Sequence, residues 1–157
     1  MLNDYKSGFT PNPDIMCNHH IKFDAFYKYA VKHLGVDAIA MGHYARTNFG
    51  PFLEHFNEGS TVKLLKGTDT LKDQSFFLSR VHQEALKHCL FPVGHLHKLT
   101  VRQMATNSGL LQNVASKPDS VGMCFIGPRH FRHFIDQVNN FFINFQLLFI
   151  IQQLIST

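Results

Sequence analysis

The stretch from residue 15 to residue 43 constrains the fold more than any other. Between residues 15 and 34, apolar side chains recur at helical spacing and share one face: Phe23, Phe26, Tyr27, Ala30, Val31 and Leu34. Gly35 stands where the C-cap of a helix belongs, and VDAIAM at 36–41 is typical of a buried strand that leads into a loop at Gly42 and His43. A helix, a glycine and a buried strand form half of an α/β unit, and parallel sheets usually contain such strands. We therefore expect an α/β fold.

The rest of the chain predicts shorter elements. Residues 1–14 are expected to be extended or loop-like, and the two prolines that flank Asn12 in TPNPD exclude a helix there. The elements expected after the strand are, in chain order, a hairpin of strands 52–56 and 61–65, a helix over 75–90, a helix that Thr100 and Gln103 cap and Gly109 ends, a loop and short strand within 116–127, and a last helix that begins near Pro128.

Composition and charge limit the class of protein. A length of 157 residues with 45% hydrophobic content fits one folded domain. The formal net charge of +4 is compatible with nucleic acid as a partner but does not require it. Three cysteines without C-x-x-C spacing exclude a disulfide-rich secreted scaffold and a zinc ribbon. The first residues have neither a signal-peptide nor a transit-peptide pattern, which favours a cytosolic protein or a natural beginning upstream of Met1.

The apolar run at 141–151 is too short for a membrane span. Its eleven residues fall well below the ~20 that a spanning helix needs, so we expect no membrane partner. From Asn139 onward the chain has no charged residue. We interpret 139–157 as a divergent apolar tail.

Asp14 and Cys17 are the first candidates for chemistry. They lie three residues apart at the expected start of a helix, so they share one face. A helix N-terminus stabilises a thiolate, and a carboxylate one turn away can accept or donate a proton. The same residues also suit a structural role, with Asp14 as the N-cap and Cys17 as a small buried side chain. The pattern alone leaves both interpretations open.

The other two cysteines differ in their surroundings. Cys124 lies in VGMCFIG between two glycines, which let a backbone approach a ligand or move, although a buried strand cysteine fits as well. Cys89 stands beside Leu86, Leu90 and Phe91, and we expect it to fill the core.

Two polar segments are candidates for binding. Lys72, Asp73 and Gln74 form a polar loop before SFFL, and Lys and Gln side chains can contact phosphates and bases. A solvated turn that caps a helix is the alternative. Gly42 and His43 follow the buried strand, where ligands of open α/β sheets usually bind.

A metal site is a weaker hypothesis. Cys17, His19 and His20 are close in sequence, and His130 and His133 lie three residues apart on the last expected helix. A zinc site would need these two groups to meet in space, and nothing in their spacing indicates that they do. We therefore expect no metal.

Five segments, read in chain order, resemble one family. They are GFTPNPDIMCNHHIKF (8–23), AIAMGHYAR (38–46), LKDQSFFLS (71–79), FPVGHLHKLTVRQMA (91–105) and DSVGMCFIGPRHFRHFI (119–135). Over about residues 1–138 they resemble the tRNA-specific 2-thiouridylases, most of all the animal mitochondrial members, which are similar to PP-loop ATP pyrophosphatases. The resemblance implies a partial Rossmann-like, adenine nucleotide alpha hydrolase-like domain with appended helices. Its expected parts are the C-terminal part of the nucleotide-binding domain at 1–80, a helical extension with the second cysteine loop at 81–138, and the tail at 139–157.

The resemblance also implies the chemistry. The family uses ATP, with Mg²⁺, to activate the C2 oxygen of the wobble uridine in tRNA, and replaces that oxygen with persulfide sulfur from a donor or relay protein. By motif position Cys17 matches the nucleophile, Cys124 matches the persulfide carrier, and the two would form a disulfide. Asp14 matches the acid/base residue. The matched binding residues are Gly42 for the nucleotide and Asn12, Pro13, Asp14, His43, Lys72, Asp73 and Gln74 for tRNA. The implied compartment is the mitochondrion, with the cytoplasm as the alternative.

Two departures from the family pattern affect the expected function. The sequence contains no SGGVDSS-type loop, whose backbone N–H groups would hold the pyrophosphate, so we expect weak or absent ATP binding. The β-rich domains of the family have no counterpart either. We therefore expect a truncated member that is inactive alone, and unstable or oligomeric because its sheet lacks strands. The alternatives are a non-catalytic fragment that binds tRNA or sulfur-relay partners and, less favoured, a metal or redox module.

Overall fold

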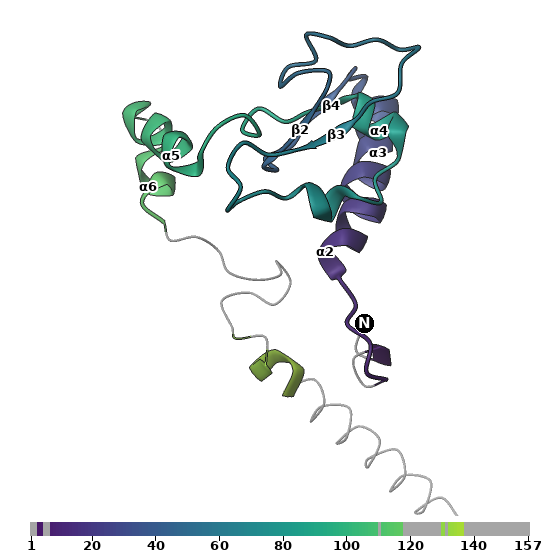
Figure 1. The fold of residues 1–157 in the computed structure, drawn as a ribbon, viewed down its shortest axis with the longest axis vertical. Helices are drawn as coiled ribbons and strands as arrows, with labels where there is room; N and C mark the ends of the chain where they lie inside the picture. Colours follow the sequence, from purple (N-terminus) through teal and green to yellow (C-terminus); the bar gives the residue numbers. More distant parts are fainter. Residues whose placement is uncertain (1–2, 5–6, 110, 118–129, 131, 137–157) are drawn as a thin grey trace, which may run out of the picture. The chain divides into compact units, whose positions relative to one another are not determined.

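The computed structural model describes residues 3–4, 7–109, 111–117, 130 and 132–136. The chain divides into two compact units, one of Asn12–Lys117 and one of Met1–Pro11 with Pro118–Thr157. The first unit contains all the elements that are labelled in Figure 1. In the second unit, residues 132–136 are helical, within the region of the last expected helix.

The longest element is a helix that continues from residue 13 to residue 34. α2 (Pro13–Met16) and α3 (Tyr27–Tyr29) are its α-helical parts, and Cys17–Phe26 and Ala30–Leu34 are wound as π-helix. Gly35 ends it with a left-handed φ of 64°, which glycine adopts without steric cost. Figure 1 shows these parts as one rod, called the long helix below. The predicted helix and its glycine stop are confirmed.

Two small sheets follow the long helix. β1 (Ile39–Ala40) pairs in parallel with β4 (Cys89–Leu90). β2 (Ala45–Thr47) pairs antiparallel with β3 (Leu64–Lys66). The succession of helix, glycine and parallel strand confirms the predicted α/β class.

The predicted hairpin is wrong. Residues 52–56 contain turns and no strand, and Leu53 has a φ of 62°, which no β-strand accommodates. The antiparallel partner of β3 is β2, which lies directly after the loop that contains His43.

The predicted continuous helix over 75–90 is also wrong. Ser75–Leu78 is a short 3-10 helix, α4 covers only Gln83–Lys87, and Cys89–Leu90 forms β4. Pairing with β1 satisfies the backbone of β4, and Cys89 is fully buried there. Tertiary contacts therefore override the local helical pattern.

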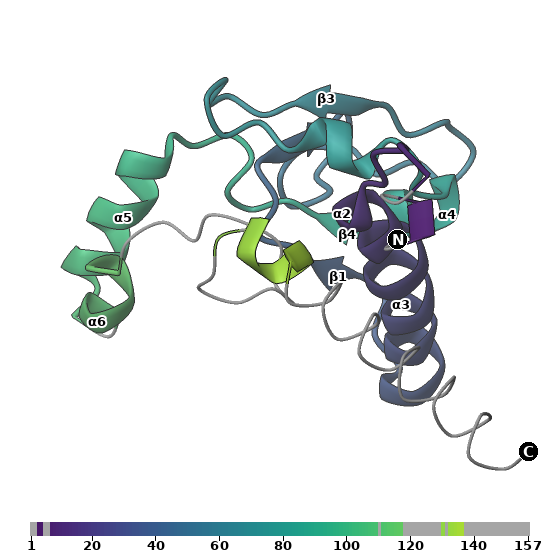
Figure 2. The ribbon, with the colours of Figure 1, turned by 90° about the horizontal axis from the view of Figure 1, so that it is seen from below.

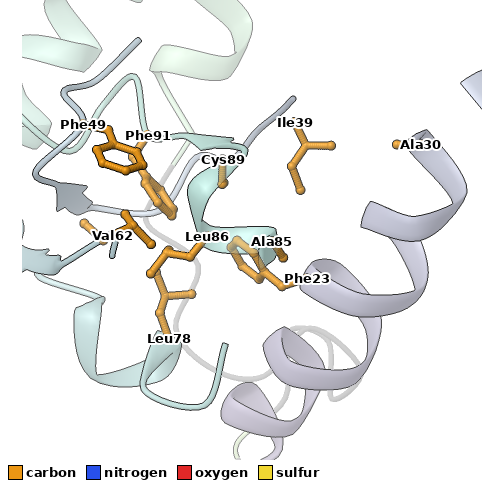
Figure 3. Packing of buried hydrophobic residues seen from close by; sticks show 11 residues of the cluster. Phe23, Ala30, Ile39, Phe49, Val62, Leu78, Ala85, Leu86, Cys89 and Phe91 are labelled. Atoms are coloured by element: carbon orange, nitrogen blue, oxygen red, sulfur yellow. The ribbon is translucent and has the colours of Figure 1, made fainter. Parts of the chain in front are cut away.

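The core is one cluster of buried apolar side chains, shown in Figure 3 between the long helix and the segments that carry the strands. The long helix contributes only Phe23 and Ala30 to it, whereas Phe26 and Leu34 of the predicted apolar face are exposed. The members of the cluster are Phe23, Ala30, Ile39, Ala45, Phe49, Val62, Leu78, Ala85, Leu86, Cys89 and Phe91.

α5 (Lys98–Asn107) and α6 (Gln112–Ala115) pack against each other (Figure 2). The capping box predicted at Thr100 and Gln103 is wrong, because α5 already begins two residues earlier. The N–H of its first residue donates to Oδ2 of Asp69 at 3.0 Å, so a carboxylate from a distant loop caps this helix.

No helix within the described ranges is both long and apolar enough to cross a membrane. The run at 141–151, the loop of Cys124 and the tail at 139–157 lie outside those ranges.

Candidate functional site

The long helix begins at a side-chain cap. Asn12 is extended, and its Oδ1 accepts hydrogen bonds from the N–H groups of Asp14 and Ile15, both at 3.1 Å. Pro13 occupies the first helical turn, where its missing N–H is not needed. The interpretation of Asp14 as the N-cap is therefore wrong. Asp14 and Cys17 lie one turn apart, and both are partly exposed.

The turn around Cys17 is attached to the segment that follows the Lys72–Gln74 loop. Three side chains from residues 16–19 make these contacts, and each reaches a different residue of 77–82. The contacts are Asn18 Nδ2 to the carbonyl oxygen of Phe77 at 3.0 Å, Met16 Sδ to Nη1 of Arg80 at 3.8 Å, and the ring of His19 to that of His82 at 5.0 Å.

Asn18 is a residue that sequence reasoning missed. It is buried, although it lies inside a helix, where asparagine is unfavourable. A polar residue one position after the candidate nucleophile, and five before the buried Phe23, was the available signal. That signal could not identify its partner, because Phe77 is 59 residues away.

Gly42 lies just beyond the carboxyl end of β1. It is exposed, and the position of a side-chain carbon has open space around it. Nucleotides bind open α/β sheets at the carboxyl ends of parallel strands. The surroundings of Gly42 therefore leave room for a ligand to approach the backbone.

His43 is buried, in contrast to Gly42. Its ring centroid lies 5.9 Å from that of Phe23 and 6.4 Å from that of Phe91, and the residue is 8% exposed. Burial, with a smaller effect from the charge of Lys22, lowers the pKa of His43 to about 4. The ring is therefore neutral at pH 7, and its Nδ1 has no hydrogen-bond partner among the described residues.

The loop Lys72–Gln74 is fixed to the backbone just before β2. Oε1 of Gln74 accepts the N–H of Tyr44 at 3.0 Å, and the N–H of Gln74 donates to the carbonyl of Tyr44 at 2.9 Å. Gln74 thus pairs with the backbone of Tyr44 through both an acceptor and a donor, as a residue of a neighbouring strand would. The side chain of Lys72 is the exposed cation of this loop.

Asp73 shapes the same loop from inside. Its Oδ1 accepts the N–H of Gly67 at 2.8 Å and that of Ser75 at 3.3 Å. Burial raises the pKa of Asp73, but these hydrogen bonds outweigh burial and leave the pKa below its usual value. The carboxylate is therefore charged at neutral pH, and its hydrogen bonds stabilise the loop.

Two buried glycines allow the chain to pack this closely. A side-chain carbon on Gly67 would lie 2.6 Å from the carbonyl oxygen of Tyr44. On Gly94 it would overlap the carbonyl oxygen of Ala45. Only glycine fits at either crossing.

Segments that the sequence singled out separately are neighbours in the first unit. Asn18 reaches the 3-10 helix after the polar loop, Gln74 reaches the residue after His43, and Phe23 touches the ring of His43. The segments brought together are 12–18, 42–44 and 72–78. Cys124 lies outside the described residues, so its pairing with Cys17 stays a prediction.

Cys89 fills the core, as predicted, although in a strand. It is 0% exposed, and burial raises its pKa to about 12. Its thiol is therefore protonated and unreactive at neutral pH.

The described residues contain no group of three or more His, Cys, Asp or Glu side chains that could hold a metal ion. The rings of His19 and His20 lie 4.3 Å apart, and the rings of His130 and His133 lie 5.8 Å apart. These contacts are between rings and give no support to a metal module.

Comparison with known proteins adds to this geometry. Residues 1–128 match the family described as the tRNA methyl transferase HUP domain. The chain is 48% identical over 151 residues to the human protein named mitochondrial tRNA-specific 2-thiouridylase 1, with 87% of the chain and 36% of that protein covered. The Drosophila melanogaster protein of the same name is 47% identical over 136 residues, with 87% of the chain and 35% of that protein covered.

A bacterial relative gives the same result. The tRNA-specific 2-thiouridylase MnmA of Alkaliphilus oremlandii is 49% identical over 134 residues, which cover 85% of the chain and 34% of that protein. The chain thus spans about a third of the length of the curated relatives that it matches.

Proposed function

Because the chain belongs to the tRNA methyl transferase HUP domain family, together with proteins named tRNA-specific 2-thiouridylases, we propose that it carries the sulfur-transfer site of a tRNA uridine 2-sulfurtransferase. The product would be 2-thiouridine at the wobble position. The observation that supports this most directly is the capped helix start, which holds Asp14 and Cys17 one turn apart in a helix that Asn18 ties to the segment after the Lys72–Gln74 loop.

The proposed reaction uses two cysteines. The terminal sulfur of a persulfide on Cys124 bonds to C2 of the uridine, and the C2–O bond breaks. The thiolate of Cys17 then attacks Sγ of Cys124, so that the sulfur–sulfur bond of the persulfide breaks and the sulfur leaves with the uridine. The cysteines end as a Cys17–Cys124 disulfide, which a thiol must reduce before the next round. Asp14 would move the proton at the target base.

ATP, when bound, supplies the adenylyl group that turns the uridine oxygen into a leaving group. Gly42 is the residue of this chain whose surroundings fit the nucleotide, and we propose Mg²⁺ as the companion of its phosphates. The sequence has no SGGVDSS-type loop for the pyrophosphate, so the residues present fit only the nucleoside side of ATP.

The tRNA would lie over the same face. The wobble base must leave its stack to reach Asn12, Pro13 and Asp14, as it does in other enzymes that modify bases. Lys72 would contact a phosphate, while Asp73 and Gln74 keep their loop in shape. His43 would support the loop at Gly42 more than it would contact tRNA directly, because little of its side chain is exposed.

The proposed sulfur donor is a persulfide-carrying relay protein. We also propose the mitochondrion as the compartment, because the animal relatives are named mitochondrial. A second candidate function is tRNA binding without catalysis. The missing phosphate-loop sequence favours it for this chain alone.

A thiolation assay tests the proposal. Unmodified tRNA, ATP, Mg²⁺ and a persulfide donor are incubated with the chain, and 2-thiouridine is measured by mass spectrometry of digested tRNA. Thiolation by the wild type, with at least about a hundredfold loss in Cys17→Ser and in Cys124→Ser, is the outcome that supports sulfur transfer by this chain. Equal activity in either serine variant would contradict the residue roles. Saturable tRNA binding without thiolation in the wild type would instead support the second candidate.

A further inference from the structure

We propose that Asn18 is a positioning residue for Cys17, acting through the hydrogen bond that ties the first turns of the long helix to Phe77. The inference rests on the proposed function for the role of Cys17. The bond runs from Nδ2 of Asn18 to the carbonyl oxygen of Phe77 at 3.0 Å. Asn18 is 2% exposed, so water cannot replace that bond.

Local preference does not explain an asparagine at this place. Its amide competes with the backbone for hydrogen bonds, which disfavours it within helices. Burying the amide is unfavourable unless it finds partners. Its Nδ2 finds one in Phe77, while its Oδ1 has no hydrogen-bond partner among the described residues. A tertiary tether accounts for a residue that the helix alone disfavours.

The tether acts on Cys17 because the two residues are adjacent on one helix. Successive helical side chains point in fixed directions relative to each other, so anchoring Asn18 also sets the direction of Cys17. The winding of the long helix changes from α to π at Cys17, a feature frequent at functional sites. The contact of Met16 with Arg80 is long and exposed, and therefore holds the turn less firmly.

The tether also sets the distance between the thiol and the polar loop. Phe77 lies in the 3-10 helix that directly follows the loop Lys72–Gln74, and Gln74 is fixed to Tyr44. Asn18 therefore connects the candidate nucleophile to the segment proposed to receive tRNA. Without this bond the two parts keep their own structure but lose their fixed spacing.

The experiment measures how fast iodoacetamide alkylates Cys17 in the full chain, read from the tryptic peptide 7–22 by mass spectrometry. The variant is Asn18→Ala. Asn48→Ala is the matched control, because it removes another asparagine bond to the backbone, in which Oδ1 accepts the N–H of Lys63 at an exposed site. Alkylation of the buried Cys89 reports whether the core stays closed.

We expect Asn18→Ala to raise the alkylation rate of Cys17 by about fivefold. The net free energy of one hydrogen bond changes the ratio of loosened to tethered helix starts by about this factor. Cys89 should stay protected, and Asn48→Ala should match the wild type. A rate for Cys17 in Asn18→Ala that is unchanged or lower would overturn the inference.

Asn18→Asp keeps the test decisive if Asn18→Ala opens the core. A protonated carboxyl can donate to the carbonyl of Phe77 and an ionised one cannot. The rate relative to wild type should therefore be near one while the carboxyl is protonated and rise towards about fivefold as it ionises with increasing pH. A ratio that stays near one across the whole pH range overturns the tether. Neither readout involves tRNA, so thiolation by Cys17→Ser would end the proposed function without touching this inference.

Discussion

The two halves of the long helix are held in different ways. In residues 13–23, the hydrogen bond of the buried Asn18 and a buried ring, Phe23, fix the helix to the rest of the unit. Residues 24–34 give the core Ala30, place Oη of Tyr27 in hydrogen-bond contact with Nδ1 of His88 at 3.3 Å, and leave Phe26 45% exposed. Apolar packing sets distance without direction, whereas a hydrogen bond sets both. Both halves have such a bond, but Asn18 is 2% exposed whereas Tyr27 is only partly buried, so the half that carries the candidate chemistry is held more firmly.

The largest test of this difference compares one phenylalanine from each half. Phe23→Ala should lower the free energy of unfolding by about 3–5 kcal/mol, because it empties a buried site next to Phe91. Phe26→Ala should change it by less than about 1 kcal/mol, since the ring is already half in solvent. Urea denaturation followed by circular dichroism measures both. Equal losses would mean that the two halves are covered alike, and a cooperative monomeric transition of the wild type would contradict the expected instability.

The next test uses the ring that packs on the first half. The pKa of His43 is about 4 in the folded chain and ordinarily 6.5, so between these values the unfolded chain binds more protons. Stability should be complete above the ordinary value and should fall as the pH drops towards 4, by about 3 kcal/mol in all.

Urea denaturation at a series of pH values measures this loss. His43→Phe keeps a ring between Phe23 and Phe91 but removes the titrating group, so the variant should lose much less stability over the same range. Identical pH profiles for the two proteins would assign the acid sensitivity to other groups.

The smallest expected effect is at the cap of the first half. Asn12→Ala removes the acceptor for the N–H groups of Asp14 and Ile15 and should lower stability by about 1 kcal/mol. Asn12→Ser keeps an acceptor and should stay within a few tenths of a kcal/mol of the wild type. Thermal denaturation at one pH is sufficient. If alanine and serine behave alike, the cap does not stabilise this half.

The sequence predicted what depends on neighbours along the chain. Helical spacing and Gly35 gave the long helix, and apolar neighbours gave Cys89 as a core residue. The failures have distant causes: β1 draws Cys89–Leu90 out of a helical pattern, and Asp69 starts α5 before the local capping signal at Thr100.

The candidate site divides in the same way. Asp14 and Cys17 were visible as a spacing of three residues, and the structure gives them a capped helix start. The burial of His43 and the bond of Asn18 were not visible, because both depend on partners dozens of residues away. The spacing of residues along the sequence indicates candidate reactive side chains, but it does not indicate the distant residues that position them.

The close crossings at Gly67 and Gly94 limit which substitutions the sequence can accept at these two positions. Even an alanine at Gly94 would bring its side-chain carbon into overlap with the Ala45 carbonyl oxygen, so no substitution fits at this position unless β2 moves. Neither glycine has a side chain that could react. A mutational scan that treats every position intolerant of substitution as catalytic would nevertheless rank both glycines beside Cys17. It would then assign a chemical role to residues that are required only because a side chain does not fit there.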